Sequence, residues 1–250
     1  MQSSDLFQRL DALFTQFLGR RSPAINVQQQ LLTLGRQFLG DRTPFVAAFV
    51  HLLNSIQTLH QCVEPLIRGR AMMELLAHLD EFELGLDAAV RDHVPASDLE
   101  VLDKALPTDW IRASHTRPVI DGIVAELRER APELWSSLVT ARLFPSPMLR
   151  TFVEAVVRIG GLSPTRFLKA MPRGWNNAYK DWCDPKLAGS GSRTATVEFS
   201  QVAPYLFEHR QHWIAIEGVL CGLVAAAKEE GRVVMRFFPA SKLVRAEVSW

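Results

Sequence analysis

The chain has few of the residues that build disulfides or metal clamps. Its three cysteines, Cys62, Cys183 and Cys221, lie far apart among 250 residues, and their number is odd. A disulfide framework needs paired cysteines, and a Cys-x-x-Cys clamp needs close ones, so the sequence excludes both. The first residues, Met1–Phe7, lack a basic stretch followed by an apolar run, and no secretory signal is predicted.

Long apolar runs are also missing. The longest apolar stretch, Trp213–Ala227, is interrupted by Glu217 and is shorter than the roughly 20 residues that a membrane-spanning helix needs. We therefore predict a cytoplasmic protein with no membrane partner.

Basic residues are not clustered on this chain. Lysine and arginine number 28 against 27 acidic residues, and residues 61–130 carry 8 basic and 14 acidic side chains. An acidic middle section repels a phosphate backbone, and nucleic-acid binding normally requires a clustered basic surface. The sequence predicts no nucleic-acid partner.

Familiar catalytic patterns are absent as well. The chain has no phosphate-binding loop, no Gly-x-Gly-x-x-Gly and no Gly-x-Ser-x-Gly elbow. The acidic residues Asp80, Glu81 and Glu83 lie together in a charged stretch, and nothing there marks a raised pKa. The sequence therefore predicts no catalytic residues, although an enzyme with an unrecognised site is an alternative.

The carboxyl-terminal sixty residues contain the clearest secondary-structure pattern. Apolar and polar residues alternate over 192–200, 232–238 and 243–250, and a period of two is typical of a strand with one buried face. A helix is expected over about 208–230, and the four residues 239–242 suit a hairpin. No comparable run occurs upstream, so one small, mainly antiparallel sheet is expected.

The rest of the chain is predicted to be helical. Residues 45–82 are apolar on more than one side, and further helices are expected near 97–106, 118–130 and 132–143. The closely spaced Pro145 and Pro147 cannot continue a helix. We therefore predict an α+β, predominantly α-helical protein, with a helical body over 1–145 and an α+β ligand-binding-like domain over 146–250.

Several details of the second domain are predicted from spacing. Ser163 and Pro164 start a helix that Pro172 ends, and a third short helix then carries Trp175, Ala178, Tyr179 and Trp182 on one face. Residues 184–192 are expected to form a flexible loop. The Gly218 and Gly222 pair is expected to let its helix lie close to the sheet.

A known family resembles this part of the chain. The segment 172–179 (Pro-Arg-Gly-Trp-Asn-Asn-Ala-Tyr), the strand after it, the helix with Glu217 and Gly218, and a last strand closing on Trp250 resemble a myxobacterial paralogous family of unknown function. That family is similar in outline to the ligand-binding fold of heme nitric-oxide-binding domains, four-vinyl-reductase-like sensor domains and TRAPP subunits. The resemblance covers residues 146–250 and implies either a small-molecule sensor or a scaffold.

The chain departs from the cofactor-binding branches of that fold. The heme-binding branch has a Tyr-x-Ser-x-Arg run, whereas Tyr179 is followed by Lys-Asp-Trp-Cys and Tyr205 by Leu-Phe-Glu-His. The vinyl-reductase-like branch has cysteines near its last strands, and this chain has none after Cys221. The resemblance therefore implies no heme and no metal, and no cofactor is expected.

Aromatic side chains supply the candidate ligand site. Rings with a polar edge suit a pocket that orients a small molecule, and the hypothesised cavity is lined by Trp175, Tyr179, Trp182, Trp213 and Cys221. The alternative is that these rings pack the helix onto the sheet. His209 and His212 are spaced to share a metal, but no third ligand is recognisable, so no metal site is predicted.

These observations favour a non-enzymatic small-ligand-sensing or protein-interaction module in bacterial signalling. Its ligand is expected to be a small apolar organic molecule. One alternative is a scaffold or adaptor whose helical body docks a protein partner or forms a homodimer.

Overall fold

The structure is a computed structural model that describes residues 64–143 and 163–250. All of these residues belong to one compact unit, Glu64–Trp250. The helices predicted before residue 64 and the boundary predicted near Pro145 lie outside the described residues and stay predictions.

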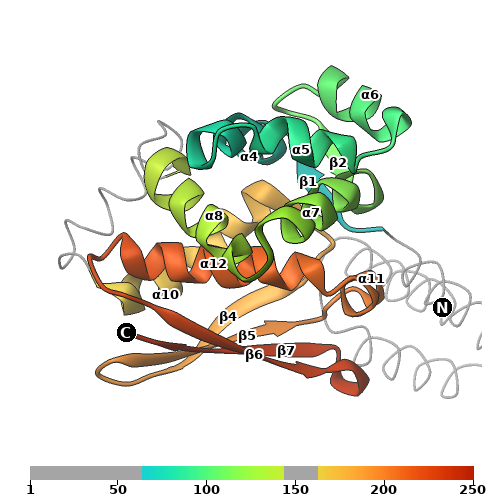
Figure 1. The fold of residues 1–250 in the computed structure, drawn as a ribbon. Helices are drawn as coiled ribbons and strands as arrows, with labels where there is room; N and C mark the ends of the chain where they lie inside the picture. Colours follow the sequence, from blue (N-terminus) through green and yellow to red (C-terminus); the bar gives the residue numbers. More distant parts are fainter. Residues whose placement is uncertain (1–63, 144–162) are drawn as a thin grey trace, which may run out of the picture. The chain divides into compact units, whose positions relative to one another are not determined.

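The predicted α+β class is confirmed. A four-stranded antiparallel sheet has the order β4-β5-β7-β6, and helices cover one of its faces (Figure 1). Its strands are β4 (Asp184–Ser190), β5 (Thr194–Ser200), β6 (Arg232–Phe238) and β7 (Leu243–Ser249). The three alternating runs are therefore strands, and a 3-10 turn, η3 (Pro239–Ser241), followed by Lys242 at φ 47° closes the predicted hairpin.

Alternation along the central strands decides which face of the sheet is buried. Val197 of β5 pairs with Ala246 of β7, and both are fully buried. The next residue pair, Glu198 and Arg245, points the other way and forms an ion pair at 2.7 Å on the outer face. A period of two thus separates a core face from a charged face.

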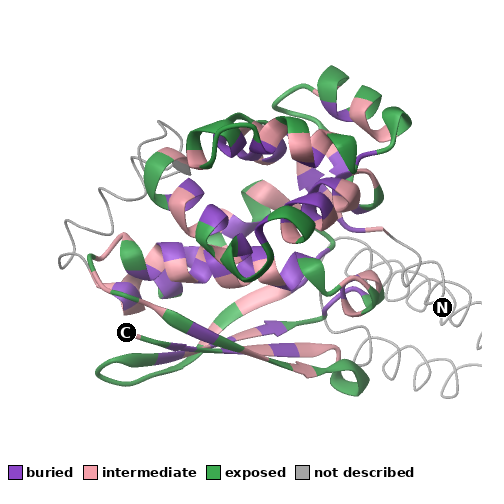
Figure 2. Ribbon diagram, viewed as in Figure 1, coloured by how far each residue is buried: buried purple, intermediate pink, exposed green. Residues whose placement is uncertain are grey.

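Helices form two layers above the core face of the sheet. α10 (Pro164–Ala178) and α12 (Gln211–Ala225) lie next to the strands, and the helices of residues 69–143 lie beyond α12 (Figure 1). The outer layer contains α4 (Gly69–Phe82), α5 (Leu86–Asp92), α6 (Ala96–Lys104), α7 (Ala113–Leu127), the 3-10 turn η1 (Arg128–Arg130), α8 (Ala131–Leu138) and the π-helix η2 (Val139–Leu143). Figure 2 shows that buried residues gather along α12 and on the surfaces facing it.

The prediction of a single sheet was wrong. A second antiparallel sheet has the order β2-β1-β3, formed by β1 (Leu66–Arg68), β2 (Trp110–Arg112) and β3 (Tyr179–Lys180). Strands of two or three residues are too short to display a period of two, so only pairing between distant segments creates them. The sheet links β1, near the start of the described chain, to the end of α10.

Two predictions around α10 were also wrong. Pro172 does not end a helix but lies inside α10, whose buried face continues from Met171 to Trp175. The helix ends at Ala178, so Tyr179 lies in β3 and Trp182 lies beyond it, not on a helical stripe.

The flexible loop predicted over 184–192 was wrong as well. This segment is largely the edge strand β4, which pairs with β5 through a register shift between Leu187 and Gly189.

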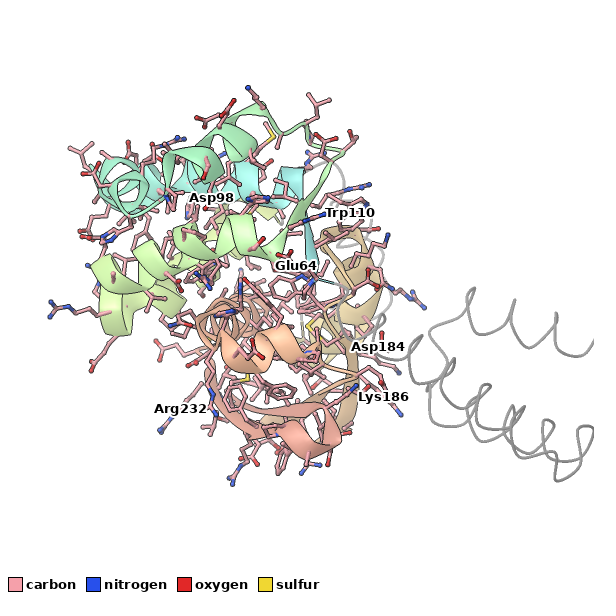
Figure 3. All side chains as sticks on the ribbon, turned by 90° about the vertical axis from the view of Figure 1, so that its right-hand side faces the viewer. Glu64, Asp98, Trp110, Asp184, Lys186 and Arg232 are labelled. Carbon is pink, nitrogen blue, oxygen red and sulfur yellow. The ribbon has the colours of Figure 1, made fainter. Side chains whose placement is uncertain are left out.

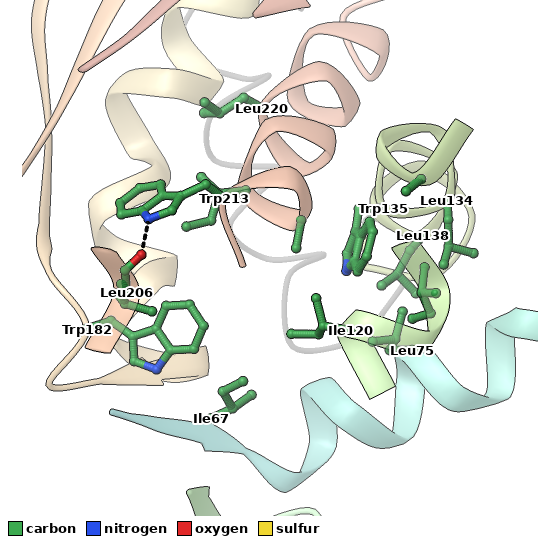
Figure 4. Packing of buried hydrophobic residues seen from close by; sticks show 14 of the residues in the cluster. Ile67, Leu75, Ile120, Leu134, Trp135, Leu138, Trp182, Leu206, Trp213 and Leu220 are labelled. Carbon is green, nitrogen blue, oxygen red and sulfur yellow. Dashed lines mark hydrogen bonds between the residues drawn. The ribbon is translucent and has the colours of Figure 1, made fainter. Parts of the chain in front are cut away.

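The helix predicted over 208–230 is α12 (Gln211–Ala225), and a separate short helix precedes it. The short helix α11 (Pro204–Glu208) has His209 as its C-terminal cap residue, and α12 begins at Gln211. Because the chain turns between them, Leu206 of α11 and Trp213 of α12 face each other in the core (Figure 4).

The Gly-x-x-x-Gly pair of α12 serves a helix contact, and its predicted role against the sheet was wrong. A Cβ atom on Gly218 would lie 2.3 Å from the carbonyl oxygen of Pro132, and one on Gly222 would lie 2.7 Å from Cβ of Val139. Both glycines therefore face α8 and the start of η2, where only a missing side chain permits the approach. Figure 4 shows Trp135 and Leu138 of α8 beside α12 in the same core.

A search of the described residues for a helix long and apolar enough to cross a membrane found none.

A buried polar and aromatic cluster at the start of α12

Three of the predicted site residues do come together. The ring centroids of Trp175 and Tyr179 are 4.3 Å apart, and those of Tyr179 and Trp182 are 4.7 Å apart. The series continues to His212, whose ring meets Trp182 edge-on at 5.1 Å. The ring of Tyr205 also lies near this imidazole, with 5.8 Å between the two ring centroids.

Trp213 belongs to the core and not to this series of rings. Its indole contacts Phe199 at 5.4 Å, and its Nε1 donates a hydrogen bond of 2.9 Å to the carbonyl oxygen of Leu206 (Figure 4). With its only donor paired and its ring buried, Trp213 has no polar edge left for a ligand.

Cys221 lies two turns further along α12. Its Sγ donates a weak hydrogen bond of 3.6 Å to the carbonyl oxygen of Gly231, just before β6. Burial, and then the nearby Glu217 charge, raises the pKa of this thiol to about 11. Cys221 is therefore a small core residue with little thiolate character, placed apart from the ring series.

His212 is the most unusual residue of the group. It is 0% exposed, and neither of its ring nitrogens has a hydrogen-bond partner among the described residues. Burial lowers its pKa to about 3, with smaller contributions from His209 and from the Arg117 guanidinium. The imidazole is therefore neutral at physiological pH and offers one donor and one acceptor.

Further unpartnered polar atoms lie on side chains near His212 or near its neighbour Tyr205. We define the His212 cluster as Arg117 and Asp121 of α7, Trp182, Tyr205 of α11, His209 and His212. In the part of the chain that the structure describes, eight buried side-chain nitrogen and oxygen atoms lack a hydrogen-bond partner, and six of them belong to this cluster. They are Arg117 Nε, Asp121 Oδ1, Trp182 Nε1, the Tyr205 hydroxyl and both nitrogens of His212.

The charges of the cluster nearly balance. Arg117 Nε lies 3.5 Å from Asp121 Oδ2, and Arg117 Nη1 lies 3.4 Å from His209 Nε2. Burial raises the pKa of Tyr205 to about 12; Arg117 opposes this rise, while Glu64 and Asp121 add to it. Glu64, labelled in Figure 3, also accepts a hydrogen bond from the backbone N–H of Ser114 at the start of α7. Within the cluster one guanidinium thus pairs with one carboxylate, and the Glu64 carboxylate lies near enough to Tyr205 to raise its pKa.

Neither a metal nor a heme fits this geometry. No group of three or more His, Cys, Asp or Glu side chains that could hold a metal occurs among the described residues, and a guanidinium occupies the approach to His209 Nε2. A porphyrin bound to His212 would have to displace Trp182 or Tyr205, whose rings lie within 6 Å of the imidazole.

Comparisons with known proteins find similar folds but no similar sequences. No protein-family model and no curated protein matches the chain, so the resemblance to the myxobacterial family stays a prediction. Solved structures that resemble it are H-NOX domains. An unliganded Fe(II) H-NOX protein from K. algicida matches with a TM-score of 0.49 and 10% identity over 73% of this chain and 96% of that one.

Two further H-NOX structures give similar values. A mutant of the T. tengcongensis H-NOX protein has a TM-score of 0.45 and 15% identity, over 73% of this chain and 97% of that one. An oxygen-binding H-NOX domain related to soluble guanylate cyclases matches with a TM-score of 0.47 and 13% identity, over 73% of this chain and 93% of that one. At these values the likeness carries no argument about what this chain binds.

Sequence reasoning missed half of the cluster. Arg117 and Asp121 are distant in sequence from the aromatic residues, and nothing in their local pattern distinguishes them from an ion pair on an exposed helix. His209 and His212 were noticed only as a metal pair, whereas the structure makes them two imidazoles in different surroundings.

Proposed function

We propose that this chain is a small-molecule-binding module whose ligand binds at the His212 cluster, and that it acts as a sensing domain in bacterial signalling. The observation that carries the proposal is that six of the eight buried polar side-chain atoms without a hydrogen-bond partner among the described residues belong to this cluster, two of them on the neutral imidazole of His212. A buried polar atom without a partner costs about 1–3 kcal/mol, so a ligand that supplies the missing hydrogen bonds would stabilise the folded chain.

The charges of the cluster favour an uncharged ligand. His212 and Tyr205 are neutral at physiological pH, and the cation of the cluster, Arg117, already faces Asp121. An anion would meet the carboxylates of Asp121 and Glu64, and Arg117 is already engaged with the first of these. The unpartnered atoms include both donors and acceptors, so the ligand should carry both.

The aromatic rings favour a flat ligand. Trp182 and Tyr205 flank His212, and Tyr179 extends the series, so a planar molecule would have ring surfaces to lie against. An uncharged nitrogen heterocycle with amide-type edges has the right shape and polarity. This proposal keeps an organic ligand but replaces the apolar one expected from the sequence.

Native mass spectrometry of the freshly purified chain tests the proposal directly. A small molecule released on denaturation is expected from the wild-type chain and from Cys221→Ala, whose sulfur lies apart from the cluster. It should be absent from His212→Phe, which keeps a ring but removes both nitrogens. Equal retention by His212→Phe and the wild type would rule this site out.

A thermal-melting series covers a ligand that is lost on purification. Uncharged heterocycles such as adenine, uracil and imidazole above pH 8 should raise the melting temperature of the wild type and leave that of His212→Phe unchanged. Acetate and phosphate serve as anionic controls. If no compound acts and a dimer mass is found instead, the scaffold alternative is favoured.

A further inference from the structure

A hydrogen-bonded series of side chains connects α4 to α8, apart from the His212 cluster. His78 of α4 is buried, with 4% of its surface exposed. Its Nε2 lies 2.7 Å from Ser137 Oγ of α8, and its Nδ1 lies 3.0 Å from Glu81 Oε2. A hydroxyl, an imidazole and a carboxylate are thus arranged in order, each within hydrogen-bond distance of the next.

Arg142 holds the carboxylate end of this series. Its Nε donates to Glu81 Oε2 at 3.0 Å, and its other nitrogens reach the second Glu81 oxygen, Glu74 Oε2 and the carbonyl oxygen of Ala77. These hydrogen bonds, first from Arg142 and then from His78, lower the pKa of Glu81 below its usual value. Arg142 lies in the π-helix η2, and π-helical turns are frequent at functional sites.

The ionised carboxylate decides where the imidazole proton lies. Since Glu81 can only accept, Nδ1 of His78 must be the donor in that bond. A neutral His78 therefore presents the lone pair of Nε2 to Ser137, whose single hydroxyl proton is shared between two acceptors, Nε2 and the carbonyl oxygen of Leu134. When His78 is protonated, Nε2 donates to Oγ, and the hydroxyl can donate to the carbonyl oxygen of Leu134 at 2.9 Å.

We propose that Ser137 is a base-activated nucleophile that accepts an acyl group from an activated ester. Nucleophile, base and orienting group at these distances are the arrangement that activates a serine. His78 is shielded from solvent, whereas Ser137 is half-buried. The inference is independent of the ligand site proposed at His212.

The step balances without a co-reactant. Ser137 Oγ bonds to the ester carbonyl carbon while its proton passes to Nε2 of His78. The tetrahedral intermediate collapses, the bond to the leaving oxygen breaks, and Nε2 returns the proton to the departing alcohol or phenol. The product is an ester of Ser137, which water can cleave by the same route in reverse.

Acetylation by p-nitrophenyl acetate, followed by peptide mass spectrometry, tests the inference on the whole chain. The acetyl group is expected on Ser137, and Ser137→Ala should lose both that peptide modification and the early release of p-nitrophenol. Ser136→Ala is the matched control, because Ser136 is the adjacent half-buried serine and its backbone faces Gly222 of α12. The Ser136→Ala variant should be acetylated at Ser137 like the wild type.

The base and the orienting group are tested by rate. His78→Gln should slow acetylation of Ser137 by about a hundredfold or more, as expected for loss of a general base. Glu81→Gln should slow it less, and Glu81→Asp should restore part of the loss, which a purely structural role would not predict. Acetylation of lysines alone, or an equal rate on Ser137 in His78→Gln, would overturn the inference.

Discussion

The two halves of α12 are built in opposite ways. Towards its carboxyl end, Gly218 and Gly222 allow the backbone of α12 to meet α8 and η2 at distances that exclude any side chain. At its amino end, His212 is equally buried, but neither of its ring nitrogens is paired with any described residue. His212, Gly218 and Gly222 are therefore all buried, but only in the carboxyl-terminal half are the buried polar groups all paired within the helix.

The difference shows which half is structural. A contact that only glycine permits, made by backbone already hydrogen-bonded within its helix, needs nothing more to be stable. A buried imidazole without partners makes the fold less stable than an apolar residue of the same shape would. Such a cost is expected where a site is kept for binding.

The largest effect is expected at the glycine contact. Gly218→Ala places a Cβ against the carbonyl oxygen of Pro132 and should lower the free energy of unfolding by about 2–3 kcal/mol, because backbone must move. Gly174→Ala in α10 is the control, since a Cβ there would meet no described atom within 4 Å apart from its own turn of the helix, and it should gain up to about 1 kcal/mol. Urea unfolding measures both, and equal effects would show that the helix contact is loose.

The two indoles give the next largest contrast. Trp213→Phe leaves the carbonyl oxygen of Leu206 without its donor, whereas Trp182→Phe removes an N–H that has no partner among the described residues. Trp213→Phe should therefore cost roughly 1–3 kcal/mol more than Trp182→Phe in urea unfolding. A greater cost for Trp182→Phe would mean that its N–H does have a partner.

His212 should make stability depend on pH. An unfolded histidine takes up a proton near pH 6.5, whereas buried His212 does so only near pH 3. The part of the free energy of unfolding that depends on a neutral His212 is fully present above pH 6.5. It falls as the pH is lowered towards 3, by up to about 1.4 kcal/mol per pH unit.

His212→Phe should remove that part of the pH dependence. The variant is also expected to be as stable as the wild type or more so, since no unpaired ring nitrogen remains at position 212. Urea unfolding at several pH values between 3 and 7 checks both statements. An unchanged slope would mean that another group is responsible.

Cys221→Ala should have the smallest effect. It removes one half-buried sulfur atom and a weak hydrogen bond to Gly231, and a loss of about 1 kcal/mol or less is expected. Its melting curve should show the same response to any ligand as that of the wild type. A selective loss of that response would place Cys221 in the site after all.

Much of the four-stranded sheet could be predicted from the sequence. β5, β6 and β7 alternate because one face meets α10 and α12 and the other meets water, and this asymmetry is visible residue by residue. β4 could not be predicted in the same way. It is an edge strand with Pro185 and Gly189 and little burial on either face, so it carries no alternating signal.

The site was predicted only in part. Trp175, Tyr179 and Trp182 were expected to be neighbours on a helix, and they are neighbours, but β3 and the turn after it bring Trp182 into place. Arg117 reaches His209 across 92 positions of sequence. No pattern of neighbouring residues predicts a contact between positions so far apart.

The sequence alone determined the helical and strand periodicity, the absence of close cysteines and the aromatic content of the region after Pro172, because each is a property of neighbouring residues. Only the tertiary structure decided that Gly218 and Gly222 face α8, that β1 joins β3, and that His212 is buried with nitrogens that no described residue pairs. These features depend on which distant segments pack together. Hydrogen-bond satisfaction is a property of that packing and of no single segment.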